Sequence, residues 1–446
     1  MAEARGPEGP WSEWIRERDD WRSARGKPEA LDDLTVLDLS SGHLGGCFCS
    51  SILAEFGAEV IRVEPPGGDI LRRFSPFGYQ HKGTGLAYLV EGRNKLHVTL
   101  NLRRPEGRRL LARLAAKADV LLETFPAGQM DTWGIGYRQL SAKNPRLIYC
   151  ALTSYGQFGP RARTGARKPS YDVTEQALSG VVHITGEMAS GGKPQPWEVP
   201  TKVGGWFAWY AAGAWAAFGI LTALEYRRVS GQGQLVDVTG AEGTMRYVED
   251  MVLWYEKSGT IRERIGPLDA SAFPYTFVKS KGGYTMLAGF SDPNFTALTT
   301  IMGRPDLKEG PRFRTFLDRA RLPNKKVLHA ELERWSTRHT SEEILAKVQD
   351  YMLNKRGPGT VATGRVNTPA DVLHEENWWE RGALQRVEDP DYGDLVLQGQ
   401  PWKMTETPPR LRWACRPVGK DNASVYLKYL GIGEARLHAL KKQQVI

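Results

Sequence analysis

A strand–helix–strand pattern near the N-terminus constrains the fold of this 446-residue chain more than any other feature. The apolar run 34–40, LTVLDLS, precedes a helical segment at 45–57 that ends at Gly57, and a second apolar run follows at 58–64. Further segments of the same kinds are a helix at 104–118 and apolar runs at 119–124, 147–156 and 234–239. Because this alternation is typical of parallel strands joined by crossover helices, it predicts an α/β fold with a Rossmann-like large domain and a mostly parallel sheet.

The pattern changes near residue 260, where 276–289, TFVKSKGGYTMLAG, has the alternation and central glycines of an antiparallel hairpin. We therefore expect a smaller α+β domain at 260–370. The other boundaries are an N-terminal extension at 1–30, the first part of the large domain at 31–255, and a return segment with C-terminal helices at 371–446 that completes it. In the extension, the spacing of Trp11, Trp14, Ile15 and Trp21 predicts a short amphipathic helix.

Charge and cysteine content narrow the function classes. The chain has 60 Lys and Arg against 51 Asp and Glu, a formal net charge of +9, but the charge is dispersed and no block of five like charges occurs. We therefore expect an anionic small ligand and no nucleic acid. Four cysteines are too few for a secreted disulfide framework, and the first thirty residues lack the apolar core of a signal peptide, so we expect a cytoplasmic protein. The eight histidines contain no i, i+4 pair, and we expect no metal.

The segment 203–224, VGGWFAWYAAGAWAAFGILTAL, carries no charge and is long enough to cross a membrane. However, it is rich in Gly and Ala, stands alone in mid-chain, and precedes more α/β pattern rather than a basic flank. We interpret it as a buried core helix and expect no membrane association.

Two segments are candidates for binding or catalysis. Residues 40–46 form a glycine-rich turn between the first strand and its helix, where helical N–H groups favour an anion. The turn lacks the GxGxxG spacing, although Glu64 stands where a dinucleotide-binding fold places its ribose-binding acid, so an NAD-linked dehydrogenase is a weak alternative. Asp172, in SYDVTEQALSG, begins an expected helix, and the residues alone favour an acid that serves the helix N-terminus.

Several ordered blocks of the sequence resemble the family III CoA-transferases, the formyl-CoA-transferase and carnitine-CoA-transferase group. The blocks are LTVLDLSSGHLGGCFCSSILAEFGAEVIRVEPPGGD, GRNKLHVTLNL followed by PEGRRLLARLAAKADVLLETF, NPRLIYCALTSYGQFGP, SYDVTEQALSG and SGQGQLVDV. The likeness runs from about residue 31 to 250 and resumes in the C-terminal GKDNASVYLKYLGIGEARLHALKKQQVI.

The resemblance implies an enzyme that moves CoA from an acyl-CoA donor, such as succinyl-CoA, to a carboxylic acid. The family's nucleophilic Asp falls on Asp172, where it would form a covalent aspartyl-CoA thioester. Coenzyme A and acyl-CoA are then substrates, and no tightly bound cofactor is expected. An interlocked dimer is also implied, either a homodimer or a heteromer with a related chain. The residues that we expect to contact or attract CoA are His43, Leu44, Arg72, Arg73, Arg93, Lys95, Thr124 and Phe125.

The sequence also departs from the family pattern. The usual Arg after the Glu-Asn-Phe run is absent, because the run here is Glu123-Thr124-Phe125-Pro126, and Trp209 stands in the long helix where many members carry an Asp. These departures leave open a catalytically silent subunit of a heteromeric CoA-transferase, as in benzylsuccinate-type enzymes. An acyl-CoA racemase on the same fold is a weaker alternative, because it needs a His before the Asp and a second acid, whereas this chain has Tyr171 and Trp209.

Overall fold

The computed structural model describes residues 15, 21–165, 171–188, 198–354 and 357–446. The chain divides into two compact units. The large unit contains residues 1–181, 203–249 and 375–446, and the small unit contains 182–202 and 250–374. The amphipathic helix predicted around Trp11 and Trp14 lies outside the described residues, while Trp21–Gly26 forms the 3-10 helix η1.

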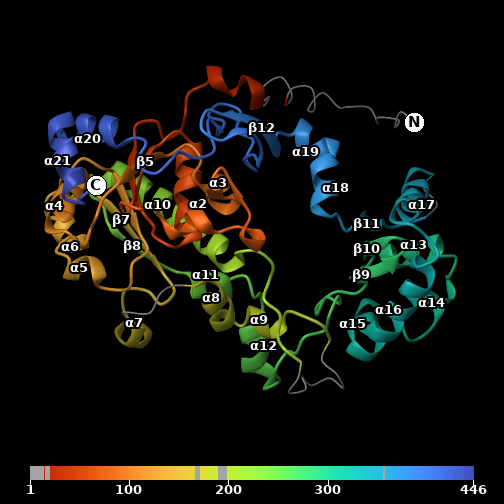
Figure 1. Ribbon diagram of the computed structural model, residues 1–446. Helices are drawn as coiled ribbons and strands as arrows, with labels where there is room; N and C mark the ends of the chain where they lie inside the picture. The colour runs from red at the N-terminus through yellow and green to blue at the C-terminus, as the bar shows by residue number, and fades with distance from the viewer. Residues whose placement is uncertain (1–14, 16–20, 166–170, 189–197, 355–356) are drawn as a thin grey trace. The chain divides into compact units, whose positions relative to one another are not determined.

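A six-stranded parallel sheet is the centre of the large unit (Figure 1). Its strand order is β5-β2-β1-β6-β7-β8, and each neighbouring pair is parallel. The predicted α/β fold with a parallel sheet is therefore confirmed, and the structure adds β5, a short strand that the sequence analysis does not predict. The strands are β1 (Thr35–Leu39), β2 (Glu59–Glu64), β5 (Leu96–Thr99), β6 (Val120–Glu123), β7 (Ile148–Thr153) and β8 (Leu235–Thr239).

Helices cover both faces of this sheet because the strands are apolar on both sides. On β1, Val36 packs in the core with helices α2 (Leu44–Glu55) and α10 (Phe207–Ser230). Its neighbours Leu37 and Leu39 pack on the other face, with α4 (Pro105–Ala115) and α20 (Asn422–Leu430). Helix α20 lies beside α4 and α21 (Glu434–Lys442), so the end of the chain covers the sheet next to a segment three hundred residues earlier (Figure 1).

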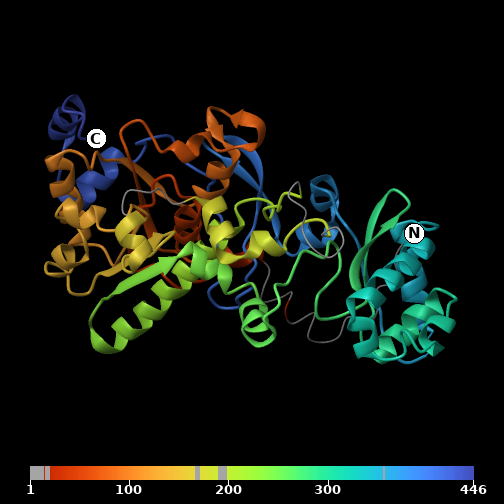
Figure 2. The same cartoon turned by 90° about the horizontal axis from the view of Figure 1, so that it is seen from below.

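The long apolar segment forms α10, which begins a few residues later than predicted and ends at Gly231 in the left-handed conformation (φ +73°). Within the described residues it is the one helix that is long and apolar enough to cross a membrane, and 50% of its apolar window is buried inside the protein. It runs alongside β8 in Figure 2 and also packs against α2 and β7. The expected core helix is therefore observed.

Shorter elements complete the large unit. Strands β12 and β13 pair antiparallel with each other. These elements are η2 (Ile70–Arg73), η3 (Pro76–Gly78), β3 (Gln80–His81), β4 (Thr84–Gly85), α3 (Leu86–Glu91), α5 (Gln129–Thr132), α6 (Tyr137–Ser141), α7 (Pro160–Gly165), α8 (Asp172–Ser179), α11 (Gly240–Met245), α19 (Glu376–Glu380), β12 (Leu384–Asp389) and β13 (Gly393–Gln398).

The small unit contains the predicted antiparallel hairpin, formed by β9 (Tyr275–Ser280) and β10 (Gly283–Ala288). The unpredicted strand β11 (Ala362–Arg365) pairs with the other edge of β10. The associated helices are α9 (Val181–Ile184), α12 (Met251–Ser258), α13 (Asp292–Ile301), α14 (Asp306–Glu309), α15 (Phe316–Ala320), α16 (Leu322–Ser336), α17 (Ser341–Leu353) and α18 (Pro369–His374).

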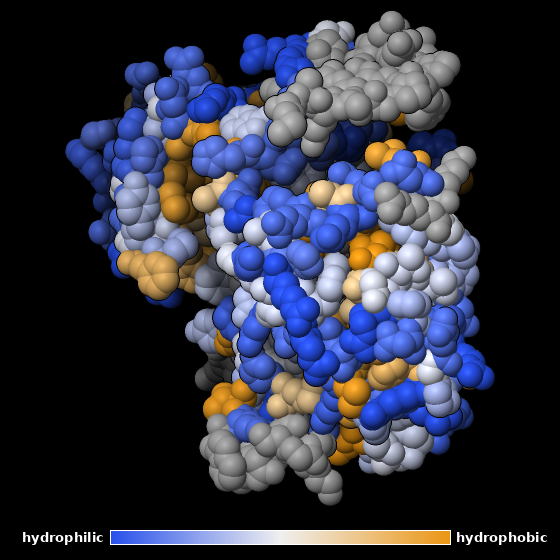
Figure 3. Space-filling view, turned by 90° about the vertical axis from the view of Figure 1, so that its right-hand side faces the viewer, coloured by the Kyte–Doolittle hydropathy of each residue, from blue (hydrophilic) through white to orange (hydrophobic). Residues whose placement is uncertain are grey.

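Figure 3 shows one face of the molecule, on which hydrophilic side chains predominate and the apolar patches are separated from one another by hydrophilic ones.

Two glycines allow α2 and α10 to touch through their backbones. A Cβ atom on Gly45 would lie 2.2 Å from the carbonyl oxygen of Trp209, and one on Gly213 would lie 2.3 Å from the carbonyl oxygen of Gly45. Both distances are far below van der Waals contact, so any larger residue must push the two helices apart.

We expect the substitution Gly213→Ala to lower the free energy of unfolding by about 1–3 kcal/mol, because the strain of overpacking exceeds the gain in helix propensity. Chemical denaturation followed by circular dichroism measures this change. The matched control is Gly67→Ala, since a Cβ there meets no atom within 4 Å. An equal stability of the two variants would contradict the proposed helix contact.

Glu123, at the end of β6, is a buried acid in this sheet. Burial raises its pKa to about 8, although the carboxylate accepts hydrogen bonds from the backbone N–H of Phe125 (2.6 Å) and the hydroxyl of Tyr149 (3.4 Å). Between its ordinary pKa and this raised value, the folded protein keeps a proton that the unfolded chain releases. Folding stability therefore falls as the pH rises through this interval.

The substitution Glu123→Gln removes this titration, so its stability relative to the wild type should rise by about 3 kcal/mol between pH 5 and pH 8. Denaturant titrations at several pH values measure the difference, with the exposed Glu376→Gln as control. Parallel pH profiles for wild type and Glu123→Gln would show that Glu123 is ionised in the folded state.

Candidate active site

Asp172 is the first residue of α8 and is held at both carboxylate oxygens. Oδ1 accepts a hydrogen bond from the backbone N–H of Trp209 (3.1 Å), and Oδ2 accepts one from the Gln176 amide (2.7 Å). The Gln176 side chain is fixed in turn, because its carbonyl oxygen accepts a hydrogen bond from the N–H of Val203 (2.9 Å). The Asp172 residue is only 1% exposed, so its carboxylate has a single defined orientation.

The environment of Asp172 changes its acidity in opposing ways. Burial raises the pKa of Asp172, and the nearby charge of Glu175 raises it further, while the hydrogen bonds from Trp209 and Gln176 lower it. The net direction is upward. The carboxylate is therefore more basic, and a better nucleophile when ionised, than a solvated aspartate.

The site lies beyond the carboxyl ends of three parallel strands, where α/β folds place their ligands. The turn after β1 contributes His43, the end of β7 leads into Ser154, and β8 leads into Gly240 at the start of α11. Helix α8, which begins with Asp172, packs on both α10 and α11.

His43 is the N-cap residue of α2, and this position places its side chain in the site. Its Nδ1 accepts a hydrogen bond from the backbone N–H of Gly46 (3.2 Å), and its ring contacts that of Trp209 in a tilted arrangement with a centroid distance of 4.7 Å. Its Nε2 lies 3.7 Å from Oε1 of Glu175. The same oxygen of Glu175 accepts a hydrogen bond from the Ser154 hydroxyl (2.7 Å).

Three other predicted residues lie around the glycine-rich turn or behind it. Leu44 is fully buried in the apolar cluster that includes Trp209, and the Thr124 hydroxyl donates to the carbonyl of Ser41 (3.4 Å). Phe125 packs against Trp133 in the core on the opposite face of the sheet. The structure thus brings His43, Leu44 and Thr124 together, and directs the Phe125 ring elsewhere.

The predicted cationic contacts for CoA are mostly in ion pairs within the chain. Arg72 donates to both carboxylate oxygens of Glu64 (2.7 Å each). The ammonium of Lys95 is fully buried and donates to the carbonyl of Cys47 (2.7 Å), with Oδ2 of Asp38 at 3.4 Å. Arg73 is exposed. CoA could reach Arg72 or Lys95 only by displacing these partners, and their role in CoA binding remains a prediction.

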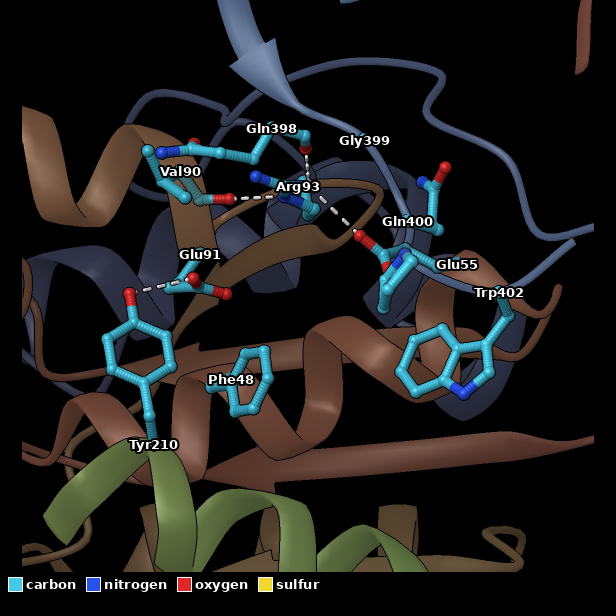
Figure 4. Close-up of a pocket in the computed structure, with 11 residues that line it drawn as sticks. Phe48, Glu55, Val90, Glu91, Arg93, Tyr210, Gln398, Gly399, Gln400 and Trp402 are labelled. Atoms are coloured by element: carbon cyan, nitrogen blue, oxygen red, sulfur yellow. Dashed lines mark hydrogen bonds and ion pairs between the residues drawn. The ribbon is translucent and has the colours of Figure 1, made fainter. Parts of the chain in front are cut away.

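Arg93 lines a separate pocket of about 260 Å³ (Figure 4). Its guanidinium donates to Glu55 (3.0 Å) and to the carbonyl oxygens of Val90 and Gln398. Phe48 and Tyr210 form part of the apolar wall. Asp172 does not line this pocket, so the structure places Arg93 apart from the candidate nucleophile.

A buried ion network supports the glycine-rich turn and was not predicted. Arg62 donates to Asp38 (2.9 Å) and to Asp69 (3.0 Å), and Asp69 accepts from the backbone N–H of Gly42 (3.2 Å). Sequence reasoning also missed Glu175, Gln176 and Ser154. The first two could have been found from their spacing, since residues three and four positions after Asp172 lie on the same helix face.

Comparison of the sequence with known proteins identifies its family. The family model of CoA-transferase family III matches residues 31–422. The succinyl-CoA–D-citramalate CoA-transferase of Chloroflexus aurantiacus is 33% identical over 95% of this chain and 100% of that protein. The alpha subunit of the succinyl-CoA–L-malate CoA-transferase of Chloroflexus aurantiacus is 32% identical over 93% of this chain and 92% of that protein.

A solved structure supports the same assignment. The crystal structure of a CAIB/BAIF family protein from Brucella suis has a TM-score of 0.73 and 28% identity, and the match covers 90% of this chain and 100% of that chain. The relatives named above are CoA-transferases that use succinyl-CoA. The chain therefore belongs to CoA-transferase family III, as its sequence blocks predict.

Proposed function

We propose that this enzyme transfers CoA from succinyl-CoA to a short dicarboxylic acid through a covalent thioester on Asp172. The observation that carries the proposal is the buried carboxylate of Asp172, which two N–H donors orient at the carboxyl edge of the parallel sheet. The names of two relatives support the donor and the acceptor class, since one acts on citramalate and the other on malate.

The reaction needs four displacements. The Asp172 carboxylate attacks the thioester carbonyl of succinyl-CoA, the C–S bond breaks, and a mixed anhydride and CoA thiolate result. The thiolate attacks the aspartyl carbonyl and releases succinate, which leaves the aspartyl-CoA thioester. The acceptor carboxylate attacks this thioester, giving a second anhydride and the thiolate. Attack of the thiolate on the acceptor's acyl carbonyl gives the new acyl-CoA and restores Asp172.

The surrounding residues orient and tune the nucleophile. Both Asp172 oxygens accept one hydrogen bond each, which holds the carboxylate in one orientation, and each oxygen keeps a further lone pair for attack. The raised pKa of Asp172 gives a stronger nucleophile above that pKa. Because Asp172 itself carries the CoA, this chemistry needs no resident cofactor, and the four free cysteines fit the proposed cytoplasmic location.

We also propose that the chain works as a dimer. Apolar side chains are strongly exposed along the outer side of α10 and the neighbouring β8 in the isolated chain. A second copy or a related chain would bury them. These residues are Phe218 (64% exposed), Leu221, Tyr226, Val229 (77% exposed) and Leu235.

A catalytically silent subunit is the alternative function. The match to a relative that is named an alpha subunit favours it, because that relative's name implies a partner chain. Retention of Asp172 with both of its hydrogen-bond donors opposes it. The two functions differ in one observable property, since a silent subunit is inactive when purified alone.

We expect Asp172→Asn to abolish transfer, because the amide cannot form the anhydride, while the fold persists. The measurement is intact-protein mass spectrometry after incubation with succinyl-CoA, with hydroxylamine trapping and peptide mapping. The wild-type chain should show an adduct on Asp172, and Asp172→Asn should show none. Near wild-type transfer by Asp172→Asn would refute the nucleophile, and absence of an adduct in the chain alone would favour the silent subunit.

The proposed dimer can be tested by the mass of the protein in solution. Light scattering coupled to size-exclusion chromatography should give twice the mass of one chain. The double variant Phe218→Glu, Val229→Glu should shift the mass toward the monomer, because two buried unpaired charges oppose association. The control is Glu225→Gln on the same helix, at an already exposed polar position. A monomeric wild type at micromolar concentration would contradict the proposal.

A further inference from the structure

Glu175 is a buried carboxylate beside the nucleophile that the proposed reaction does not use. It lies on α8 three residues after Asp172 and is 0% exposed. Its Oε1 accepts a hydrogen bond from the Ser154 hydroxyl (2.7 Å) after β7. On α11, a Cβ atom at Gly240 would lie 1.8 Å from Oε2, so only glycine leaves room for the carboxylate there. Three elements therefore fix Glu175 in place.

His43 faces this carboxylate with a defined proton. Because Nδ1 accepts a hydrogen bond from the Gly46 N–H, the neutral ring carries its proton on Nε2. Nε2 lies 3.7 Å from Oε1 of Glu175, which is too long for a hydrogen bond, and it has no hydrogen-bond partner among the residues that the structure describes. A buried donor without a protein acceptor is available to a ligand atom.

Trp209 links this donor to the nucleophile. Its indole ring lies against the His43 ring in a tilted arrangement, with a centroid distance of 4.7 Å, and its backbone N–H donates to Asp172 at 3.1 Å. The His43 ring is thus held between Trp209 on one side and the Glu175 carboxylate at its Nε2 edge. Trp209 therefore contacts both Asp172 and the ring that carries the unpaired donor.

We propose that Glu175 is a positioning residue for CoA transfer: the negative charge of its carboxylate, 3.7 Å from Nε2, attracts the polar N–H edge of the His43 ring and orients it, and this Nε2–H donates to the oxygen that becomes negative when Asp172 attacks a thioester. This inference rests on the proposed function. A preoriented donor stabilises the developing oxyanion without reorganising during the reaction. Glu175 acts through His43 and does not itself touch the reacting atoms.

The charge of Glu175 also affects how the rate depends on pH. The charge that acts on the pKa of Asp172 is that of Glu175 on the same helix, and His43, the N-cap of α2, faces Glu175. Helix α10 contributes the uncharged Trp209, and α11 contributes Gly240 beside Glu175 and the acidic Glu242 in its first turn. Since the Glu175 charge raises the pKa of Asp172, its removal should move the acidic limb of the rate profile to lower pH.

The test measures how fast the full-length wild-type protein and its variants form the Asp172 adduct with succinyl-CoA. Glu175→Gln keeps an acceptor for Ser154 but loses the charge, and His43→Asn keeps a helix-capping side chain but loses Nε2. We expect adduct formation to slow about 10-fold in Glu175→Gln, and about 100-fold in His43→Asn, at unchanged half-saturating succinyl-CoA. The double variant should match His43→Asn, and the surface control Glu225→Gln should match the wild type.

Three results would decide against the inference. Wild-type adduct formation in Glu175→Gln, or multiplication of the two single effects in the double variant, would overturn it and leave the proposed function standing. Absence of an Asp172 adduct in the wild type would overturn the proposed function as well. If Glu175→Gln does not fold, as judged by circular dichroism, Ser154→Ala removes one hydrogen bond from the same carboxylate and should slow adduct formation about threefold; an unchanged rate there would overturn the inference.

Discussion

The backbone contact between α2 and α10 is the constraint on which the site depends. Gly45 and Gly213 let the two helices approach until no Cβ fits between them. This approach places His43, the cap of α2, against the indole of Trp209, and it places the N–H of Trp209 on Asp172. A separation of the helices would therefore affect the contact between the His43 and Trp209 rings and the orientation of Asp172 together.

Buried charges stabilise the turn that this contact positions. Burial raises the pKa of Asp38, but Arg62 and Lys95 lower it more, to about 2. Asp69 shares Arg62 and also binds the N–H of Gly42, so the glycine-rich turn is tied to the sheet by ion pairs rather than by packing alone. Each of these cations balances an acid inside the protein. Their presence in a sequence block shared with CoA-transferases can thus reflect the architecture of the turn as well as ligand binding.

Elements marked by a local residue pattern could be predicted from the sequence, whereas elements and side-chain contacts that depend on residues distant in the sequence could not. Strands β1, β2, β6, β7 and β8 and helix α10 were predicted because apolar runs and spacing mark them. Strand β5 was missed because its four residues, LHVT, are few and include His97, which is buried among distant partners such as Glu64 and Cys415. The family resemblance selected Asp172 as the proposed nucleophile, whereas the position of Lys95 beside Asp38 depends on partners 57 residues apart in the sequence.

The arrangement of acids around Asp172 suits nucleophilic transfer better than proton transfer on two sides of a carbon. A racemase needs two acid–base groups that approach the substrate from opposite directions. Here the long helix offers Asp172 the backbone N–H of Trp209, and the second carboxylate, Glu175, is on the same helix as Asp172. Both acids therefore extend from one element. Since Nδ1 of His43 accepts the helix-capping hydrogen bond, His43 offers no free basic nitrogen, and this favours the proposed nucleophilic role of Asp172 over two-sided proton transfer.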